Sequence, residues 1–151
     1  MACNLLTVNL TKSLDEEFPK YLTNVYENSR LAAIAGNEIL DMGGFPPIER
    51  IKKNTLKFRP IGIGFTGLQH AMNHFNISYA DEHEAPKFAK ATQLALMLGS
   101  MQGSIDYAEF SESKGGKLEP RKWNTAYVTK IRKEAEEFAK KLQKKPPGKS
   151  T

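Results

Sequence analysis

Apolar and polar residues alternate near the N-terminus of the chain. Over residues 3–10, Leu6, Val8 and Leu10 fall on one face and more polar positions fall on the other, which predicts a short strand with one buried face. The pattern then changes to helical spacing, which recurs with interruptions as far as the C-terminal region. The chain is therefore expected to be mainly helical, with a few short strands.

The first helical pattern follows Ser13 and Glu16, which have the spacing of a capping box. The pair Gly43-Gly44 is expected to end this helix, and the following Pro46-Pro47 pair prevents the chain from resuming a helix at once. The predicted apolar stripe of the helix consists of Phe18, Leu22, Val25, Ala32, Ile39 and Leu40.

The middle of the chain is less regular. Residues 48–58 are basic and read as irregular, with at most a helical turn over 48–53. A short apolar stretch over 60–64 leads into a glycine-rich turn, and a short helix is expected over 68–74.

A long helix is predicted from about Glu84 to Tyr107, with acidic residues at 81–84 placed favourably at its N-terminus. Leu96 and Met97 widen its apolar stripe, so this helix should be buried on more than one side. The stripe itself contains Phe88, Ala91, Leu94, Ala95, Leu98, Met101 and Ile105.

The C-terminal part of the chain combines a loop, a helix and a tail. Residues 111–122 have the composition of a loop, after which Trp123 and Tyr127 are expected to anchor the chain. Residues 125–143 predict an amphipathic helix whose stripe contains Val128, Ile131, Ala135, Phe138 and Leu142. A proline pair at 146–147 should stop it, with the last residues disordered.

Composition fits one globular domain with a modest core, since the 151 residues are 40% hydrophobic and 26% charged. The chain has one cysteine, Cys3, so an intrachain disulfide is excluded. No apolar run reaches the roughly 18–20 residues that cross a bilayer, and no secretory signal pattern is visible. We therefore expect a reducing, cytoplasmic setting.

The net charge of +5 lies entirely near the C-terminus, because residues 1–129 hold equal numbers of basic and acidic side chains. Residues 130–151 hold eight Lys or Arg and three Glu. Such a tail can attract phosphate or an anionic membrane. A solvated helix face explains the charge as well. Nucleic-acid binding is not expected, because stacking on bases needs aromatic side chains and the tail has only Phe138.

The segment Arg59-Pro60-Ile61-Gly62-Ile63-Gly64-Phe65-Thr66-Gly67-Leu68 contains the spacing G-x-G-x-x-G. A dinucleotide site would need a full strand before the first glycine, and Pro60 makes that strand short. The kinase version of the motif lacks its following valine and nearby lysine. The residues favour a tight strand-to-helix turn over a nucleotide site, so no cofactor is expected.

Two further groups of residues could carry chemistry. His70 and His74 stand one helical turn apart, and His83 lies between two glutamates, but their spacing favours surface histidines over a metal site. Cys3 lies in an apolar segment, which is typical of a small buried side chain. A redox role for Cys3 would require a second cysteine from another chain.

The order of segments resembles the large, catalytic subunit of ribonucleotide reductase. Residues 3–10 resemble the family's C-N-L-x-x-x-N-L, and 45–49 resemble its proline-containing connector. Residues 54–68 are similar to N-x-x-x-x-R-P-I-G-I-G-x-x-G-L, and the long helix follows in the same order. Residues 110–116 and the Trp123-Asn124 pair are similar to a stretch with S-x-G and a W-N pair. The resemblance covers residues 3–124, and 125–151 are expected to form an appended amphipathic helix and basic tail.

This resemblance implies α/β ancestry, with the chain forming a mainly helical part of a ten-stranded α/β barrel. It also implies that Cys3 corresponds to one of the two cysteines that reduce the ribose. The family's thiyl-radical cysteine, with its neighbouring asparagine and glutamate, precedes the matching region, and its C-terminal redox cysteines follow it. With one cysteine, the chain is expected to be inactive as a reductase by itself.

Two hypotheses follow from the resemblance. The chain is either a non-catalytic accessory subunit of a larger assembly or one piece of a split reductase to which it supplies Cys3. Departures from the family pattern at Phe65-Thr66 and Gln69-His70, together with the basic tail, favour the accessory subunit. Both hypotheses imply an obligate protein partner.

Overall fold

A computed structural model of the protein describes residues 3–45, 47–115 and 125–144. The described elements form two strands, five α-helices and one short 3₁₀ helix. In chain order they are β1 (Asn4–Asn9), η1 (Leu10–Lys12), α1 (Phe18–Met42), α2 (Glu49–Phe58), β2 (Ile61–Thr66), α3 (Leu68–His74), α4 (Glu84–Ser113) and α5 (Thr125–Lys144).

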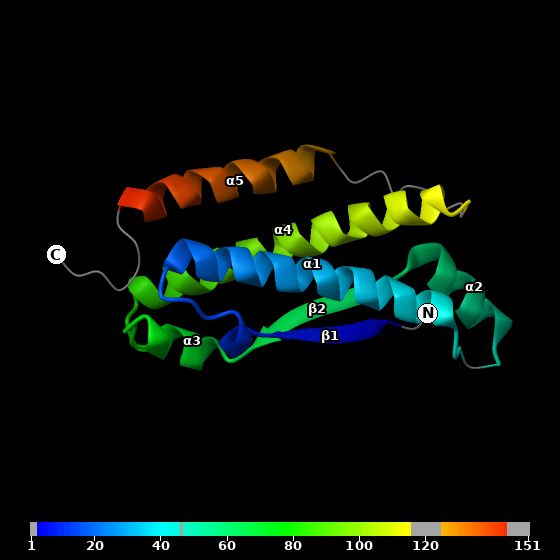
Figure 1. The fold of residues 1–151 in the computed structure, drawn as a ribbon, viewed down its shortest axis with the longest axis horizontal. Coiled ribbons are helices and arrows are strands. Elements are labelled where there is room, and N and C mark those ends of the chain that lie inside the picture. Colours follow the sequence, from blue (N-terminus) through cyan, green and yellow to red (C-terminus); the bar gives the residue numbers. More distant parts are fainter. Residues whose placement is uncertain (1–2, 46, 116–124, 145–151) are drawn as a thin grey trace.

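The elements are arranged in layers over a two-stranded parallel sheet. Figure 1 shows α1 and α4 side by side on one side of β1 and β2, with α5 running along the outer side of α4. The two strands pair from Asn4 opposite Ile61 to Asn9 opposite Thr66. Parallel strands need a crossover between them, and α1 provides it. Within the described residues, the sheet has these two strands and does not close into a barrel.

The predicted strand is confirmed, and its alternation sets which residues meet the helices. Val8 and the following Leu10 are buried, while Leu5 is 82% exposed. Leu6 lies against α1, where its side chain and that of Ile61 approach Gly36. One face of the sheet is therefore covered by α1, and the face that carries Leu5 is open.

The start of α1 differs from the capping-box prediction. The helix begins at Phe18, after Glu17, with a proline in its first turn and without a side-chain cap. Ser13 is buried instead, and its hydroxyl accepts a hydrogen bond from the Asn28 amide at 2.9 Å. The prediction failed because Pro19 fixes a backbone angle that suits the first helical turn, so the helix starts there.

The predicted end of α1 is confirmed, since Gly43 and Gly44 both have positive φ, a region that glycine adopts without strain. Most of the predicted stripe is buried or partly buried, but Ile39 is 48% exposed. The next segment was predicted to be irregular and is helix α2. Basic residues are good helix formers, and Arg59 ends the helix in the left-handed conformation.

An aromatic cluster forms the centre of the core where α1, α3 and α4 meet. Ring centres within the cluster lie 5.3–5.9 Å apart, in both stacked and edge-to-face arrangements. Its members are Phe18, Tyr21, Phe75 and Phe88. The Tyr21 hydroxyl forms a 3.1 Å hydrogen bond with Thr92, and burial raises the pKa of Tyr21 to about 12. Tyr21 therefore stays neutral inside the core.

Helices α1 and α4 approach each other through two glycines of α4. A Cβ atom added at Gly99 would lie 2.1 Å from the carbonyl oxygen of Tyr26, and one added at Gly103 would lie 2.2 Å from that of Arg30. Real side chains do not come so close, so these two positions require glycine while the helices stay at this separation.

The long helix α4 confirms the prediction and extends beyond it, to Ser113 instead of Tyr107. Residues 111–113 are therefore helical and not part of a loop, while the rest of that predicted loop from residue 116 lies outside the described residues. The Asp81 carboxylate accepts hydrogen bonds from the backbone N–H groups of His83 and Glu84, both at 2.9 Å, and so satisfies donors at the start of α4. Leu94 and Leu96 are both buried, which confirms burial on more than one side, whereas Ile105 is 36% exposed.

Helix α5 confirms the predicted C-terminal helix. Ile131 is buried, and Lys90 of α4 lies 5.6 Å from the centre of the Phe138 ring. Trp123, the side chain of Tyr127 and the tail from residue 145 lie outside the described residues. Of the helices in the described part of the chain, none combines the length and apolar character that a membrane crossing requires.

Candidate functional site

Cys3 directly precedes β1 and is exposed. The next residue fixes the chain here, because the Asn4 N–H donates to the carbonyl of Pro60 at 3.2 Å and the Asn4 side chain donates to the carbonyl of Gly36 at 3.2 Å. The expectation of a buried cysteine was wrong. Only alternate residues of this apolar segment are buried, and Cys3 is one of the exposed residues between them.

The open face of the sheet is formed by alternate residues of both strands. Leu5 and Thr7 of β1 stand opposite Gly62 and Gly64 of β2. By the alternation of strand side chains, Cys3 belongs to the same set as Leu5. The thiol therefore lies at the start of the face that the helices leave uncovered.

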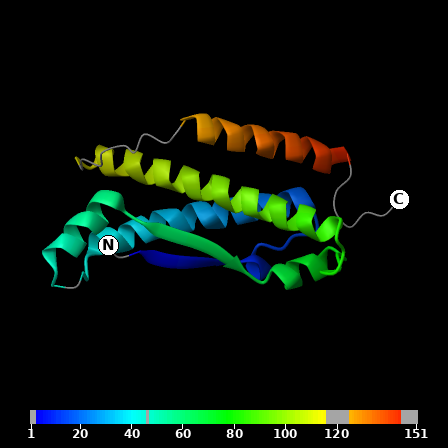
Figure 2. The ribbon, with the colours of Figure 1, turned by 180° about the vertical axis from the view of Figure 1, so that it is seen from behind.

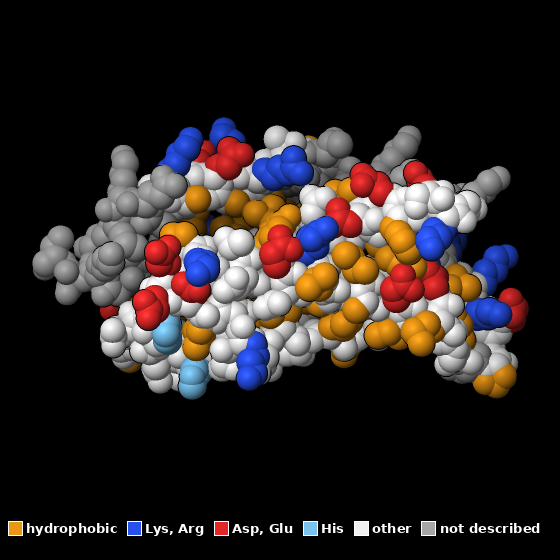
Figure 3. Space-filling view, viewed as in Figure 1, with side chains coloured by type: hydrophobic (Ala, Val, Ile, Leu, Met, Phe, Trp, Pro, Cys, Tyr) orange, Lys and Arg blue, Asp and Glu red, His pale blue; other side chains and the backbone are white. Residues whose placement is uncertain are grey.

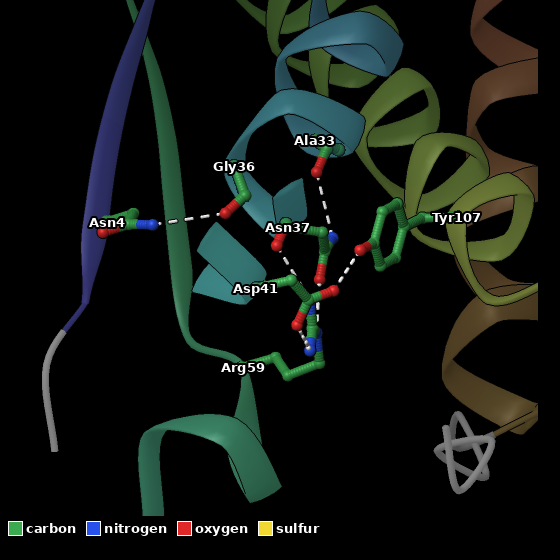
Figure 4. Close-up of polar contacts among 7 residues, drawn as sticks. All are labelled: Asn4, Ala33, Gly36, Asn37, Asp41, Arg59 and Tyr107. Atoms are coloured by element: carbon green, nitrogen blue, oxygen red, sulfur yellow. Dashed lines mark hydrogen bonds and ion pairs between the residues drawn. The ribbon is translucent and has the colours of Figure 1, made fainter. Parts of the chain in front are cut away.

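Arg59 connects the start of β2 to the C-terminal half of α1 (Figure 4). Its Nε donates to the side-chain oxygen of Asn37 at 2.8 Å, and its Nη2 donates to the backbone carbonyl of Asn37 at 2.8 Å. Its Nη1 bonds to the Asp41 carboxylate at 2.7 Å. Three hydrogen bonds from one guanidinium therefore fix the position at which β2 begins beside β1.

Tyr107 of α4 completes this cluster. Its hydroxyl donates to the second oxygen of Asp41, and its ring centre lies 5.2 Å from the guanidinium carbon of Arg59. Burial raises the pKa of Asp41, but the hydrogen bonds from Arg59 and Tyr107 outweigh it and hold that pKa below its ordinary value of 3.8. Burial and the bond to Asp41 raise the pKa of Tyr107 to about 12. These polar groups bond to one another, so the cluster is suited to holding the start of β2, α1 and α4 together.

The depressed pKa of Asp41 predicts a loss of stability in acid. A carboxyl whose pKa is lower in the folded state stabilises the fold above its unfolded pKa, near 3.8, and loses that contribution as the pH falls through the folded value. We expect Asp41→Asn to be less stable than the parent chain at pH 6, with the difference shrinking between pH 4 and pH 2. Urea titrations at several pH values measure this, and a difference that is constant over the whole range would contradict it.

The glycine run does not form the turn that its spacing predicted. Gly62 and Gly64 lie inside strand β2, and only Gly67, with φ of 83°, lies at the turn into α3. Its added Cβ would meet the Thr11 side chain at 3.0 Å, so Gly67 allows α3 to pack closely on the segment after β1. Two of the three glycines are therefore unavailable for a phosphate-binding turn.

The histidines do not assemble a metal site in the part of the chain that the structure describes. His70 and His74 lie on α3, and the Nε2 of His74 is 3.0 Å from the carbonyl oxygen of Asp15. No group of three metal-ligating side chains is found among the described residues. His70, His74 and His83 are all exposed, which confirms the interpretation as surface histidines.

A comparison with protein families matches residues 1–147 to the family described as ribonucleotide reductase, barrel domain. The chain belongs to the ribonucleotide reductase family. The match covers nearly the whole chain and confirms the resemblance given by the motifs. The α/β ancestry follows from it, while the described residues are mostly helical with two parallel strands.

The relatives compared below are large or alpha subunits of ribonucleoside-diphosphate reductases. The chain is 30% identical over 136 residues to a ribonucleoside-diphosphate reductase large subunit of African swine fever virus (isolate Pig/Kenya/KEN-50/1950), covering 80% of the chain and 16% of the relative. It is 31% identical over 124 residues to a ribonucleoside-diphosphate reductase subunit alpha of Chlamydia muridarum (strain MoPn / Nigg), covering 76% of the chain and 11% of the relative. A large subunit of Plasmodium falciparum (isolate Dd2) is 26% identical over 133 residues.

The chain spans about one sixth, or less, of the length of these curated relatives. No solved structure matches it. Membership of the reductase family therefore rests on sequence comparison, and the side-chain positions rest on the structure of this chain.

The sequence did not indicate the hydrogen-bonded cluster around Arg59. Arg59 was noticed as part of a motif, but its partners Asn37 and Asp41 are ordinary polar residues on a helix surface. Their spacing of four residues places them on one face, which is the only signal that could have paired them. Tyr107 comes from a helix 48 positions beyond Arg59, so its part in the cluster depends on the packing of α4.

Proposed function

We propose that the chain is a structural, accessory subunit of a ribonucleotide reductase assembly in which other polypeptides complete the barrel. The observation that carries the proposal is the two-stranded sheet, which has helices on one face and, as far as the described ranges go, nothing covering the other. A barrel-family sheet with open edges and an open face gains stability when further strands pair with it. The obligate partner expected from the sequence is part of this proposal.

Exposed apolar side chains support an assembly. Leu31, Ile39 and Met42 of α1 are 58%, 48% and 83% exposed, and a spacing of three residues places Ile39 and Met42 on one face of the helix. Leu5 of β1 is 82% exposed. Figure 3 shows apolar side chains gathered where the C-terminal half of α1 and β1 lie. Exposed apolar surface of this kind is typical of contacts with another protein.

The proposal also divides the chain into two parts. Residues 1–124 would form the barrel segment, and 125–151 would form a peripheral helix and basic tail. The position of α5 on the outer side of α4, away from the strands, supports this division (Figure 1). Membrane contact by the tail stays a prediction from its charge, and the cytoplasmic setting stays a prediction from the cysteine content.

A second candidate function is one piece of a split reductase, which the position of Cys3 favours. The thiol is exposed at the open face of the sheet, where a completed barrel would have its interior. Reduction of a ribose by two thiols moves two electrons and two protons to the substrate, breaks the C–O bond of a ribose hydroxyl, which leaves as water, and leaves a disulfide. Cys3 would supply one thiol, and a cysteine of a partner chain would supply the other.

Replacement of Cys3 by serine separates the two candidates. The complex should be purified through a tag on this chain from the cells in which it occurs, and ribonucleotide reduction should be measured for both forms. An accessory role predicts that Cys3→Ser leaves assembly intact and leaves reductase activity absent or unchanged. Loss of an activity that the unmodified complex has, with assembly intact, would reject the accessory role and support the split enzyme. Replacement of exposed Thr7 by serine on the same strand is the matched control.

A further inference from the structure

Among the described residues, β2 pairs with a strand along one edge, and the hydrogen bonds to β1 define which edge is free. The Asn4 N–H bonds to the carbonyl of Pro60, and parallel pairing then alternates along both strands. The backbone groups of Gly62, Gly64 and Thr66 face β1. Those of Ile61, Ile63 and Phe65 therefore face the opposite edge, which offers a row of donors and acceptors to another strand.

A groove of about 280 Å³ lies beside this edge, between β2 and α4. Figure 2 shows the side of the molecule on which β2 and α4 lie in front of α1. Ile61 and Ile63 line the groove from β2, and Met97 and Met101 line it from the face of α4. Methionine adapts to the shape of an apolar partner, so the groove can accept side chains of different size.

The chemistry of the groove restricts its occupant. The described residues that line it are apolar or uncharged polar, with Gln93, Ser100 and Ser104 as the polar members. A strand that pairs with Ile61, Ile63 and Phe65 would direct every second side chain toward the helices. Apolar side chains at those alternate positions would enter the groove, whereas charged ones would be buried without a partner.

We propose that the free edge of β2 and the adjoining groove are the docking surface for a barrel strand of the partner reductase polypeptide, with apolar residues at alternate positions. This inference rests on the proposed function. The family domain is a barrel, the described residues contain two parallel strands, and the match covers 16% of the viral large-subunit relative. Strand pairing at an open edge supplies main-chain hydrogen bonds, and the groove supplies side-chain specificity.

Amide hydrogen exchange at single-residue resolution tests this surface without any substitution. The native complex purified through a tag on this chain is compared with the chain alone at submicromolar concentration. We expect exchange at Ile61, Ile63 and Phe65 to slow by about tenfold or more in the complex. Gly62, Gly64 and Thr66 are internal controls, because they already bond to β1 and should change much less.

Two matched substitutions test the groove. Met97→Glu should place a charge in the groove and weaken the complex at least about tenfold. Ile105→Glu introduces the same charge on the same helix, at a position that is 36% exposed and does not line the groove, and should leave this contact in place. Circular dichroism establishes that each variant is folded, and the exchange experiment on the unmodified chain decides the matter if Met97→Glu is not.

Each outcome bears on a different claim. An alternating pattern of protection with weakened binding of Met97→Glu supports the docking surface. A complex that contains a reductase polypeptide but leaves Ile61, Ile63 and Phe65 unprotected overturns the docking surface and leaves the proposed function standing. A complex without a reductase polypeptide overturns the proposed function and, with it, this inference.

Discussion

Replacement of Gly99 by alanine is expected to lower the free energy of unfolding by about 2–3 kcal/mol. The new Cβ would lie 2.1 Å from the carbonyl oxygen of Tyr26 and 2.2 Å from the Ser29 hydroxyl. The first contact is with backbone, so it can be relieved only if α1 and α4 move apart. That movement would loosen the most extensive helix contact in the described fold.

The sign of the change in unfolding free energy of Gly99→Ala is informative. At an uncrowded helical site, glycine to alanine stabilises by about 1 kcal/mol, because alanine restricts the unfolded chain. A loss of stability at Gly99 therefore reports the closeness of the two helices. Urea unfolding followed by circular dichroism, at one protein concentration for all variants, provides the measurement. Gly64→Ala is the control, since no atom lies within 4 Å of its added Cβ. Equal stabilities for Gly99→Ala and the parent would show that the helices are farther apart than described.

Replacement of Arg59 by alanine is expected to cost about 3 kcal/mol of folding free energy, because charge-assisted hydrogen bonds are lost and their partners are left unpaired. The Arg59 side chain is only 14% exposed, so water replaces these bonds poorly. Arginine and alanine both carry a Cβ atom, so the strain of the left-handed conformation at φ of 44° is the same in both and adds nothing to the loss.

A comparison of Arg59→Ala with Arg59→Gly separates the loss of the guanidinium from the backbone strain at this position. Both variants remove the guanidinium, but glycine adopts the left-handed conformation without strain. Arg59→Gly should therefore be the more stable of the two, although still less stable than the parent. Arg59→Lys keeps the charge and loses the fork that contacts Asn37 and Asp41 together, so it should recover little. A parent-like stability of Arg59→Ala in urea unfolding would show that the cluster does not hold the elements together.

Periodicity in the sequence was enough to place β1, α1, α3, α4 and α5. Each of these has an apolar face that must be buried, and the spacing of that face distinguishes a strand from a helix. The segment of α2 was read as irregular because its basic residues outnumber its apolar ones, although they favour a helix. The glycines of β2 were read as a turn because their spacing fits a phosphate-binding motif. In the fold, Gly62 stands beside Leu5, whose side chain would meet an added Cβ at 2.8 Å.

The candidate site was only partly predictable. The resemblance identified Cys3 and the Arg59 motif, and the family match confirms the ancestry on which that resemblance depended. The interactions of Arg59 with Asn37, Asp41 and Tyr107 join residues from separate elements, so they follow from tertiary packing and not from local spacing. The same holds for the groove beside β2, whose methionines read in the sequence as part of an ordinary helical stripe.

The central claim is that this chain works as part of a reductase assembly whose other polypeptides complete its barrel. The most direct test is to purify the chain under native conditions from its own cells and to identify, by mass spectrometry, the proteins bound to it in stoichiometric amounts. The account predicts a polypeptide with ribonucleotide reductase barrel sequence, and one with an Asn-x-Cys-x-Glu stretch would point to an enzyme. A chain recovered as a free monomer that unfolds in a sharp, reversible transition, with no reductase polypeptide bound, would contradict it.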